Sequence, residues 1–244
     1  MNRLGGKIAL ISGAARGIGA ETARLMVEVG ARVIIGDILD ERGRETAREI
    51  GESAAVFQHL DVTSEEDWNT AIGAAVARWG ALDVLVNNAG KHSDALLATM
   101  PQKDWDQVIQ TNLNGVFYGC QAVMPTMVSQ RSGRIVNLSS LSAILAPAGQ
   151  TNYAAAKAGV VALTQSLAKE VARLNITVNA VCPGFVDTEA LAGLSPEDRK
   201  AAQAKVPMRR FGRPEEIAAA VRFLACPEAS YITGSILKVD GGIF

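Results

Sequence analysis

The sequence predicts a single doubly wound α/β domain, in which helices cover both faces of a mainly parallel sheet of seven strands. Short β-branched runs alternate with longer helical patterns along all 244 residues, and this alternation predicts right-handed crossovers within one sheet. Runs such as 8–11 and 33–35 are apolar on both faces, as parallel strands between two helical layers must be. No repeat, low-complexity tract or linker interrupts the pattern, so we expect residues 1–244 to form one domain.

Seven short runs are expected to be strands: Lys7–Ser12, Ala31–Gly36, Ala55–His59, Leu82–Asn87, Arg134–Leu138, Ile176–Val181 and Ile236–Val239. The expected helices are Ile18–Val29, Glu41–Ile50, Glu65–Trp79, Gln102–Val128, Tyr153–Leu174 and Glu215–Cys226. The stretches 61–65 and 213–216 carry helix-start signals. Leu191–Val206 is the one helical-looking piece outside the alternation, where an insertion would cover the carboxyl edge of the sheet.

Composition excludes several classes of function. Lys and Arg number 24 against 25 Asp and Glu, a net charge of −1 without a basic cluster, which argues against nucleic-acid binding. Cys120, Cys182 and Cys226 lie far apart, so we expect neither a metal site nor a disulfide framework, and a reducing compartment. The uncharged stretch 107–130 is long enough to span a bilayer, but its polar residues and proline indicate a buried helix. No secretory segment is recognisable, so we expect a cytoplasmic protein without a membrane partner.

A glycine-rich turn joins the first strand to the first helix. Gly13, Gly17 and Gly19 would let the backbone approach a pyrophosphate, which the free N–H groups of the helix beginning at Ile18 can hold. The spacing G-x-x-x-G-x-G differs from the standard dinucleotide fingerprint G-x-G-x-x-G. On its own, the turn could also be a tightly packed strand-to-helix connection.

Asp37 makes a dinucleotide site the better interpretation. It ends the second strand, 18 residues after the last glycine, near the spacing of about 20 at which an acid binds the ribose hydroxyls. Its carboxylate would accept hydrogen bonds from the adenosine hydroxyls and repel a 2′-phosphate, which predicts NAD rather than NADP. Arg16, inside the turn, favours the opposite, because a cation can pair with a 2′-phosphate. Asp37 carries more weight than Arg16. In a partly dry cleft, the repulsion between its carboxylate and a 2′-phosphate is stronger than the attraction that one exposed cation provides. The alternatives are a solvated strand-end residue for Asp37 and a surface charge for Arg16.

Polar segments follow the third and fourth strands. Asp61 and Val62 follow the third, and Asn87-Asn88-Ala89-Gly90 follows the fourth. Both are expected at the carboxyl edge of the sheet, where ligands bind. Asparagine amides there can also satisfy exposed backbone groups, and that structural role has at least equal support.

Tyr153 and Lys157 are the candidates for proton transfer. Their i, i+4 spacing places both on one face of a helix, about 6 Å apart along its axis. A phenol has a pKa near 10, and a neighbouring ammonium favours phenolate and lowers that pKa toward the working range. Such a pair is often only amphipathic helix surface, but the small residues at 154–156 and 158–159 suit close approach of a cofactor or another helix.

Ser140 ends the fifth strand, and its hydroxyl could stabilise a substrate oxygen alongside the phenol. Ser139 and Ser142 are rivals for this role, and strand-end capping would explain all three. Asn112 is polar within an apolar helical stretch, so it needs a partner, often water, and could belong to a proton relay.

Together these motifs resemble, in order, those of the short-chain dehydrogenase/reductases: Gly13-x-x-x-Gly17-Ile18-Gly19, Asn87-Asn88-Ala89-Gly90, Asn112, Ser140, Tyr153-x-x-x-Lys157 and Pro183-Gly184. The resemblance extends from Gly5 to Val239-Asp240-Gly241-Gly242 and implies a Rossmann-type fold. It implies that Tyr153 is the general acid or base, and that Lys157 binds the nicotinamide ribose and lowers the pKa of Tyr153. It further implies that Ser140 orients the substrate oxygen and that Asn112 holds a water that links Lys157 to solvent.

The same resemblance assigns further contacts. It implies that Pro183, Gly184, Val186 and Thr188 form a clamp on the nicotinamide, that Asp61 and Val62 meet the adenine, and that Asn88 meets the adenine-side ribose within the Asn88-Ala89-Gly90 segment. Residues 191–208 would form a substrate lid, with Leu191, Leu194, Val206 and Met208 as its apolar residues. Members are usually tetramers, so a homotetramer is expected, pairing through Gln102–Val128, Tyr153–Leu174 and the C-terminal edge.

The departures from the family pattern are few. Ser12 stands where a threonine is usual and keeps the hydroxyl. Lys91 and His92 follow the asparagine motif, where an apolar residue is common at the first position. Lys91 would bind an anionic substrate group if it faces the site, and is without consequence if it turns to solvent.

Three functions compete. The first is NAD-dependent hydride transfer to or from a small-molecule secondary alcohol or ketone that is compact, hydrophobic or cyclic, since 36–41 and 59–63 are particularly similar to bacterial hydroxysteroid dehydrogenases. The alternative is a 3-oxoacyl-carrier-protein reductase, which would favour NADPH and a basic docking surface, for which Arg131 and Arg173 are candidates. A dinucleotide-sensing module that has lost its chemistry is disfavoured, because Ser140, Tyr153 and Lys157 are all present.

Overall fold

A fully parallel sheet organises the molecule. The computed structural model describes residues 3–191, 193 and 195–244. Its strands are β1 (Ile8–Ser12), β2 (Arg32–Asp37), β3 (Ala55–His59), β4 (Val84–Asn87), β5 (Gly133–Leu138), β6 (Ile176–Pro183) and β7 (Ile236–Val239). They lie in the order β3-β2-β1-β4-β5-β6-β7, and every pairing is parallel, where the sequence predicted a mainly parallel sheet. The strand order reverses between β1 and β4, where doubly wound sheets bind ligands.

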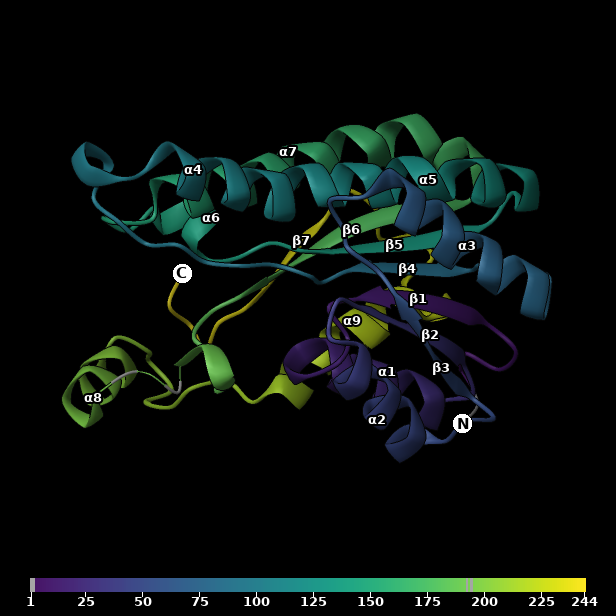
Figure 1. Ribbon diagram of the computed structural model, residues 1–244, viewed down its shortest axis with the longest axis horizontal. Coiled ribbons are helices and arrows are strands. Elements are labelled where there is room, and N and C mark those ends of the chain that lie inside the picture. Colours follow the sequence, from purple (N-terminus) through teal and green to yellow (C-terminus); the bar gives the residue numbers. More distant parts are fainter. Residues whose placement is uncertain (1–2, 192, 194) are drawn as a thin grey trace.

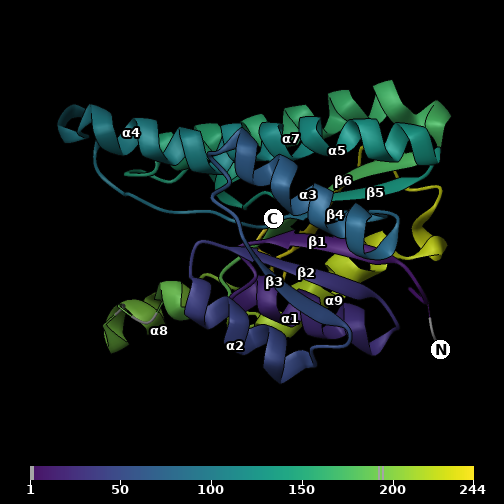
Figure 2. The same ribbon diagram turned by 45° about the vertical axis from the view of Figure 1, so that its right-hand side comes forward.

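Helices cover both faces of this sheet (Figures 1 and 2). The layer of α1 (Gly17–Glu28), α2 (Asp40–Ile50) and α9 (Pro214–Ala225) lies on one face. The layer of α3 (Glu65–Trp79), α4 (Gln102–Ile109), α5 (Gly115–Gln130) and α7 (Thr151–Val171) lies on the other. The shorter elements are η1 (Leu97–Thr99), η2 (Gln110–Asn114), α6 (Ser142–Leu145), η3 (Ala172–Leu174), η4 (Glu189–Leu191), α8 (Pro196–Ala204) and η5 (Pro227–Ala229).

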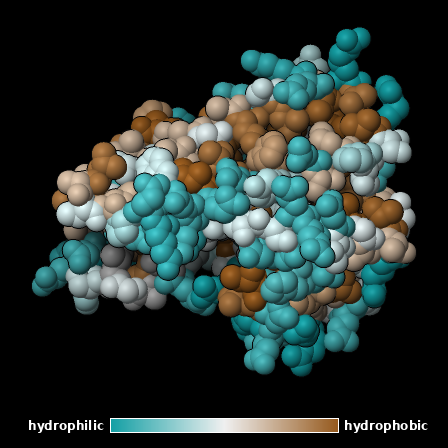
Figure 3. All heavy atoms as spheres, turned by 45° about the horizontal axis from the view of Figure 1, so that its top comes forward, coloured by the Kyte–Doolittle hydropathy of each residue, from teal (hydrophilic) through white to brown (hydrophobic). Residues whose placement is uncertain are grey.

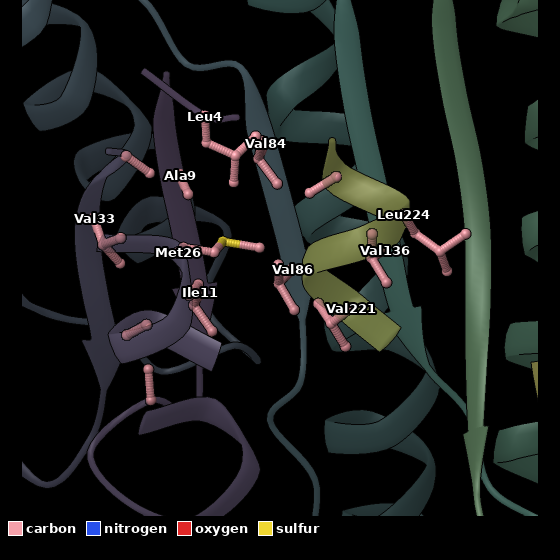
Figure 4. Packing of buried hydrophobic residues seen from close by; sticks show 14 of the residues in the cluster. Leu4, Ala9, Ile11, Met26, Val33, Val84, Val86, Val136, Val221 and Leu224 are labelled. Carbon is pink, nitrogen blue, oxygen red and sulfur yellow. The ribbon is translucent and has the colours of Figure 1, made fainter. Parts of the chain in front are cut away.

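Each face of the sheet has its own hydrophobic core. In β1, Ala9 and Ile11 join the core under α1 and α9, where Met26 and Val221 are fully buried (Figure 4). Leu10, between them in the strand, belongs to the core on the opposite face. This alternation explains why the strand sequences are apolar throughout, and it confirms the prediction of strands buried on both sides.

The expected helix Gln102–Val128 is interrupted, which corrects the prediction. α4 ends at Ile109, the five residues of η2 form a π-helical turn, and α5 begins at Gly115. A π-turn adds a residue to the helical repeat and often marks a functional site. The interruption places Asn112 at its centre, fully buried.

Helix α8, within the range 191–208, lies apart from the sheet, below its carboxyl edge (Figure 1). Of the apolar contacts expected of that range, Val206 is buried, whereas Met208 is exposed. Leu194 lies outside the described residues. Among those described, no helix combines the length and apolar character that crossing a membrane requires.

Candidate active site

A cleft of about 760 Å³ opens at the carboxyl edge, between the ends of the strands and η4. It is lined by eleven of the residues predicted to bind the cofactor: Gly13, Arg16, Gly17, Ile18, Asp37, Asp61, Val62, Asn88, Ala89, Gly90 and Thr188. It is also lined by residues that the sequence analysis did not single out as cofactor contacts: Ile38, Leu39, Leu60, Thr63, Lys91, Thr111 and Glu189. Most of these residues are adjacent in sequence to predicted contacts. Their positions just after the predicted strands could therefore have indicated that they line the cleft.

Two glycines of the turn, Gly13 and Gly19, are packed too closely for a side chain. Gly13 has φ +64°, and a Cβ there would lie 2.7 Å from Ala89 Cα. A Cβ on Gly19 would lie 2.3 Å from the Gly13 carbonyl oxygen, so Gly19 shapes the turn without lining the cleft. The turn therefore brings its backbone to the cleft wall, at the N-terminus of α1, as a pyrophosphate site requires.

The amide of Asn88 holds this turn in place. Its Nδ2 donates to the carbonyl oxygens of Ser12 at 3.0 Å and Gly13 at 2.8 Å. The Ser12 hydroxyl in turn accepts from the backbone N–H groups of Asn88 and Ala89, at 3.1 and 3.2 Å. Asn88 thus serves the structural role that the sequence analysis weighed, and it also borders the cleft.

Asp37 presents a fixed carboxylate to the cleft. Its Oδ2 accepts from the backbone N–H of Ala15 at 2.9 Å and its Oδ1 from that of Leu39 at 3.0 Å. The residue is only 8% exposed. Two backbone donors therefore hold the charge in one orientation at the end of β2, rather than leaving it as a mobile surface group.

Arg16 lies at the same cleft, but a carboxylate neutralises its positive charge. Its guanidinium forms an ion pair with Glu189, which belongs to η4, just before residues 191–208. Both side chains are largely exposed. The pair joins the glycine turn to η4 and supplies a carboxylate to the cation that could otherwise bind a 2′-phosphate.

Tyr153 and Lys157 lie on the same side of α7 and are both buried. The Lys157 Nζ is 5.7 Å from the centre of the Tyr153 ring and donates to the Leu138 carbonyl oxygen at 2.7 Å. A Cβ added to Gly90, which lines the cleft, would lie 3.6 Å from that Nζ. The pair therefore borders the inner end of the dinucleotide cleft, beyond the residues that line it.

Burial dominates the proton affinities of this pair. It raises the pKa of Tyr153 to about 12, against a lowering by the hydrogen bond of Ser140. It lowers the pKa of Lys157 to about 8. The lowering of the phenol pKa that the sequence predicted is not seen in this structure, where desolvation of the phenolate gives a net rise. At neutral pH Tyr153 carries its proton, which suits a proton donor.

Among the three serines, the structure favours Ser140 as the partner of the phenol. The Ser139 hydroxyl donates to the Lys157 carbonyl oxygen at 3.0 Å, and that of Ser142 donates to the side-chain oxygen of Gln150 at 2.9 Å. The Ser140 hydroxyl accepts from the Ser142 backbone N–H at 3.1 Å. It also lowers the pKa of the Tyr153 phenol, against the larger rise that burial causes. The Ser140 hydroxyl therefore lies beside the phenol, where one ligand oxygen could bind to both.

Asn112 fixes the backbone of Lys91. Its Oδ1 accepts from the Lys91 N–H at 3.1 Å, and its Nδ2 donates to the Lys91 carbonyl oxygen at 2.8 Å and to that of Val108 at 3.0 Å. These three contacts satisfy the hydrogen-bonding groups of the buried amide with protein atoms alone. The Lys91 side chain, whose direction the sequence left open, lines the cleft and donates to Gln107 Oε1 at 2.8 Å.

Of the predicted clamp residues Pro183, Gly184, Val186 and Thr188, only Thr188 lines the cleft. Gly184 packs against Asp240, where a Cβ would lie 2.8 Å from the Asp240 Cα, and Val186 forms a parallel bridge with Gly212. Pro183 ends the buried strand β6. The other predicted clamp residues therefore position Thr188 without bordering the cleft themselves.

His92 is a contact that sequence reasoning left open. Its ring lies on that of Tyr153, with centroids 3.9 Å apart and planes 31° apart. A position five residues after a strand gives no signal for such stacking, because the loop path is set by distant contacts.

Comparison with known proteins finds a matching family and relatives that span almost the whole chain. A family profile described as enoyl-(acyl carrier protein) reductase matches residues 13–243. A protein of Thermotoga maritima named 3-oxoacyl-(acyl-carrier-protein) reductase FabG is 47% identical over 243 residues, 99% of either chain. Proteins of the same name from Vibrio cholerae and Vibrio harveyi are 44% and 46% identical, over 99% of this chain and 98% of theirs.

Proposed function

This chain is a member of the short-chain dehydrogenase/reductase family, an oxidoreductase that binds a nicotinamide dinucleotide, and on that premise we propose that it reduces 3-oxoacyl thioesters with NADH. Tyr153 supplies the proton, Ser140 binds the reacting oxygen, and Lys157 and Asp37 hold the cofactor. The observation that carries the choice of cofactor is the Asp37 carboxylate, fixed in the cleft by two backbone N–H groups.

The substrate class rests on the relatives. The sequence analysis put a secondary alcohol dehydrogenase of the hydroxysteroid type first and a 3-oxoacyl-carrier-protein reductase second. Relatives of 42–47% identity carry the second name over almost their whole length, so they favour the alternative.

The residues present fit a dinucleotide. Gly13 and Gly19 form a turn that a Cβ would block, and the cleft runs from the Asp37 carboxylate to Gly90 beside Lys157. Asp37 would accept hydrogen bonds from the two adenosine hydroxyls and repel a 2′-phosphate. Glu189 strengthens this preference, because it already neutralises Arg16. The proposed 3-oxoacyl reductase therefore departs from the NADPH preference expected for that class.

The reaction needs one proton from the protein. Tyr153 gives its phenolic proton to the 3-oxo oxygen, which Ser140 binds through its hydroxyl. The nicotinamide, when bound, supplies the hydride that the C3 carbon requires. The Lys157 ammonium, buried beside the ring, stabilises the phenolate that remains until solvent returns the proton. The product is the 3-hydroxyacyl thioester.

The two expected carrier-docking residues lie far from the site. Arg131 follows α5 and Arg173 belongs to η3, just past the C-terminal end of α7. Tyr153 is at the opposite end of α7, about 30 Å away along the helix. These arginines therefore do not border the site of their own chain, and a small thioester is the better first substrate.

A cytoplasmic homotetramer is part of the proposal. Figure 3 looks toward the layer of α4, α5 and α7 and shows apolar residues gathered on it. On α5, Phe117 and Val128 are exposed, as are Tyr231 and Phe244 near the C-terminal edge. Burial of such surface favours association. Light scattering on the purified chain should give four chain masses, and a monomer would contradict this part.

Initial rates test the function as a whole. An acetoacetyl thioester and a hydroxysteroid should be assayed with both cofactors in their reducing and oxidising forms. We expect thioester reduction with NADH to be the fastest reaction by at least tenfold. A hydroxysteroid oxidised faster than the thioester is reduced would restore the first sequence hypothesis, and a preference for NADPH would contradict the role of Asp37.

A further inference from the structure

His92 lies against one face of the Tyr153 ring and remains partly exposed. The ring centroids are 3.9 Å apart, and about half of the His92 side chain is exposed. The proposed reaction uses the phenol oxygen, the serine and the lysine, and assigns nothing to this imidazole. An imidazole in contact with the proton donor is nevertheless placed to touch whatever the donor touches.

Two fully buried asparagines fix the backbone on both sides of His92. Asn112 bonds the N–H and the carbonyl of the preceding residue, Lys91, at 3.1 and 2.8 Å. Asn152 donates to the carbonyl oxygen of the following residue, Ser93, at 2.9 Å. Side-chain amides are rarely buried without reason, and here they preorganise the loop that presents the imidazole.

The surrounding charges leave the imidazole neutral and its N–H available. The closest acid, Asp94, is 4.0 Å from Nδ1, beyond hydrogen-bond distance, and accepts instead from Gln150 at 2.7 Å. Burial lowers the pKa of His92, the Asp94 charge raises it, and the Lys157 charge lowers it, with a net lowering. A neutral imidazole offers one N–H donor to a ligand without adding a second buried cation beside Lys157.

We propose that His92 determines substrate specificity by donating its imidazole N–H to the thioester carbonyl oxygen while Tyr153 protonates the 3-oxo oxygen. The inference rests on the proposed function and adds the second contact that this substrate requires. In a 3-oxoacyl thioester, a single methylene separates the two carbonyl carbons, so a substrate with one oxygen on the phenol brings the other to the group beside it. A simple ketone has no second oxygen, so His92 selects against it.

His92→Phe tests this contact, because phenylalanine keeps the ring stacking and removes the N–H. We expect kcat/KM for an acetoacetyl thioester to fall about tenfold, the value of one hydrogen bond of ordinary strength. For a methyl ketone of matched length we expect less than a twofold change. The Kd of the thioester for the cofactor-free enzyme, measured by fluorescence titration, should rise in parallel. His59→Phe is the matched control, because His59 is exposed and pairs with Asp40 away from Tyr153.

His92→Ala separates the contact from a packing role. If alanine lowers the rates on thioester and ketone equally and phenylalanine restores both, His92 only supports the Tyr153 ring, and the proposal is wrong. Unchanged thioester kinetics in His92→Phe overturn it as well. A wild-type enzyme that reduces ketones but no 3-oxoacyl thioester would instead refute the proposed function, and the contact with it.

Discussion

Single residues decide the chemistry through their burial. Tyr153 is 8% and Lys157 3% exposed, and the cost of charging a buried group raises the pKa of the phenol to about 12 and lowers that of the amine to about 8. At neutral pH the tyrosine is therefore a proton donor, and the lysine keeps its charge beside it. Spacing in the sequence places the two groups together, but burial sets how far apart their pKa values lie.

Replacing the proton donor should remove turnover and leave the cofactor site intact. Tyr153→Phe keeps the ring and its stacking on His92. We expect kcat to fall at least a hundredfold, as for loss of a general acid, and the Kd of NADH to stay within twofold because the cleft is lined by other residues. Steady-state kinetics and fluorescence titration measure both. A variant with nearly normal kcat would show that another group supplies the proton.

We expect the buried Lys157 ammonium to lower the free energy of unfolding at neutral pH. A drop of its pKa from 10.5 to about 8 costs roughly 3 kcal/mol of folding free energy, partly offset by about 1 kcal/mol from its hydrogen bond to Leu138. Lys157→Met should therefore be inactive but more stable by about 2 kcal/mol at pH 7, measured by urea unfolding.

The pH dependence of this difference follows from the direction of the shift. The folded-state pKa is depressed, so the penalty is fully present below pH 8 and disappears as the pH rises toward 10.5, where the lysine is neutral in both states. The advantage of Lys157→Met should shrink over that range. An advantage that is constant from pH 7 to 10.5, or a less stable variant at pH 7, would contradict burial as the cause.

At the scale of elements, the strand ends and η4 meet over the cleft. Arg16 at the start of α1 and Glu189 in η4 are joined by an ion pair across 173 residues of sequence. Glu189→Gln should release Arg16 and lower the KM for NADPH, by a few-fold only because exposed pairs are weak. Asp37→Ser should improve the NADPH to NADH ratio by more than tenfold, because it removes the fixed carboxylate.

Glu197→Gln is the control for this pair, since it removes the same charge from α8, in the lid segment, and leaves Arg16 paired. Equal effects of Glu189→Gln and Glu197→Gln would show that only net charge matters. No effect of Asp37→Ser on the ratio would remove the basis for choosing NADH.

Elements that follow from local pattern were predictable, and those that depend on distant contacts were not. The alternation of strands and helices places Asp37 and Asn88 at one edge, and helix periodicity places Tyr153 beside Lys157. The π-turn around Asn112 was missed, because one added residue hardly changes an apolar pattern. The stacking of His92 and the pairing of Arg16 with Glu189 were missed because loop paths and contacts between remote segments leave no periodic signal.

At the scale of the whole molecule, the sheet brings all these groups to one edge. The two cores fix the strands from both sides, and the reversal of strand order between β1 and β4 opens the cleft where the glycine turn, Asp37 and Gly90 converge. We therefore expect this edge to deliver hydride from NADH and a proton from Tyr153 to the 3-oxo group of a thioester.

Isotope transfer tests that claim most directly. The enzyme would be incubated with an acetoacetyl thioester and NADH deuterated at the transferred position of nicotinamide C4, and the product analysed by mass spectrometry. We expect a 3-hydroxybutyryl thioester with one deuterium on C3, formed by the wild type and not by Tyr153→Phe. A product without deuterium, or one formed only with NADPH, would contradict the account.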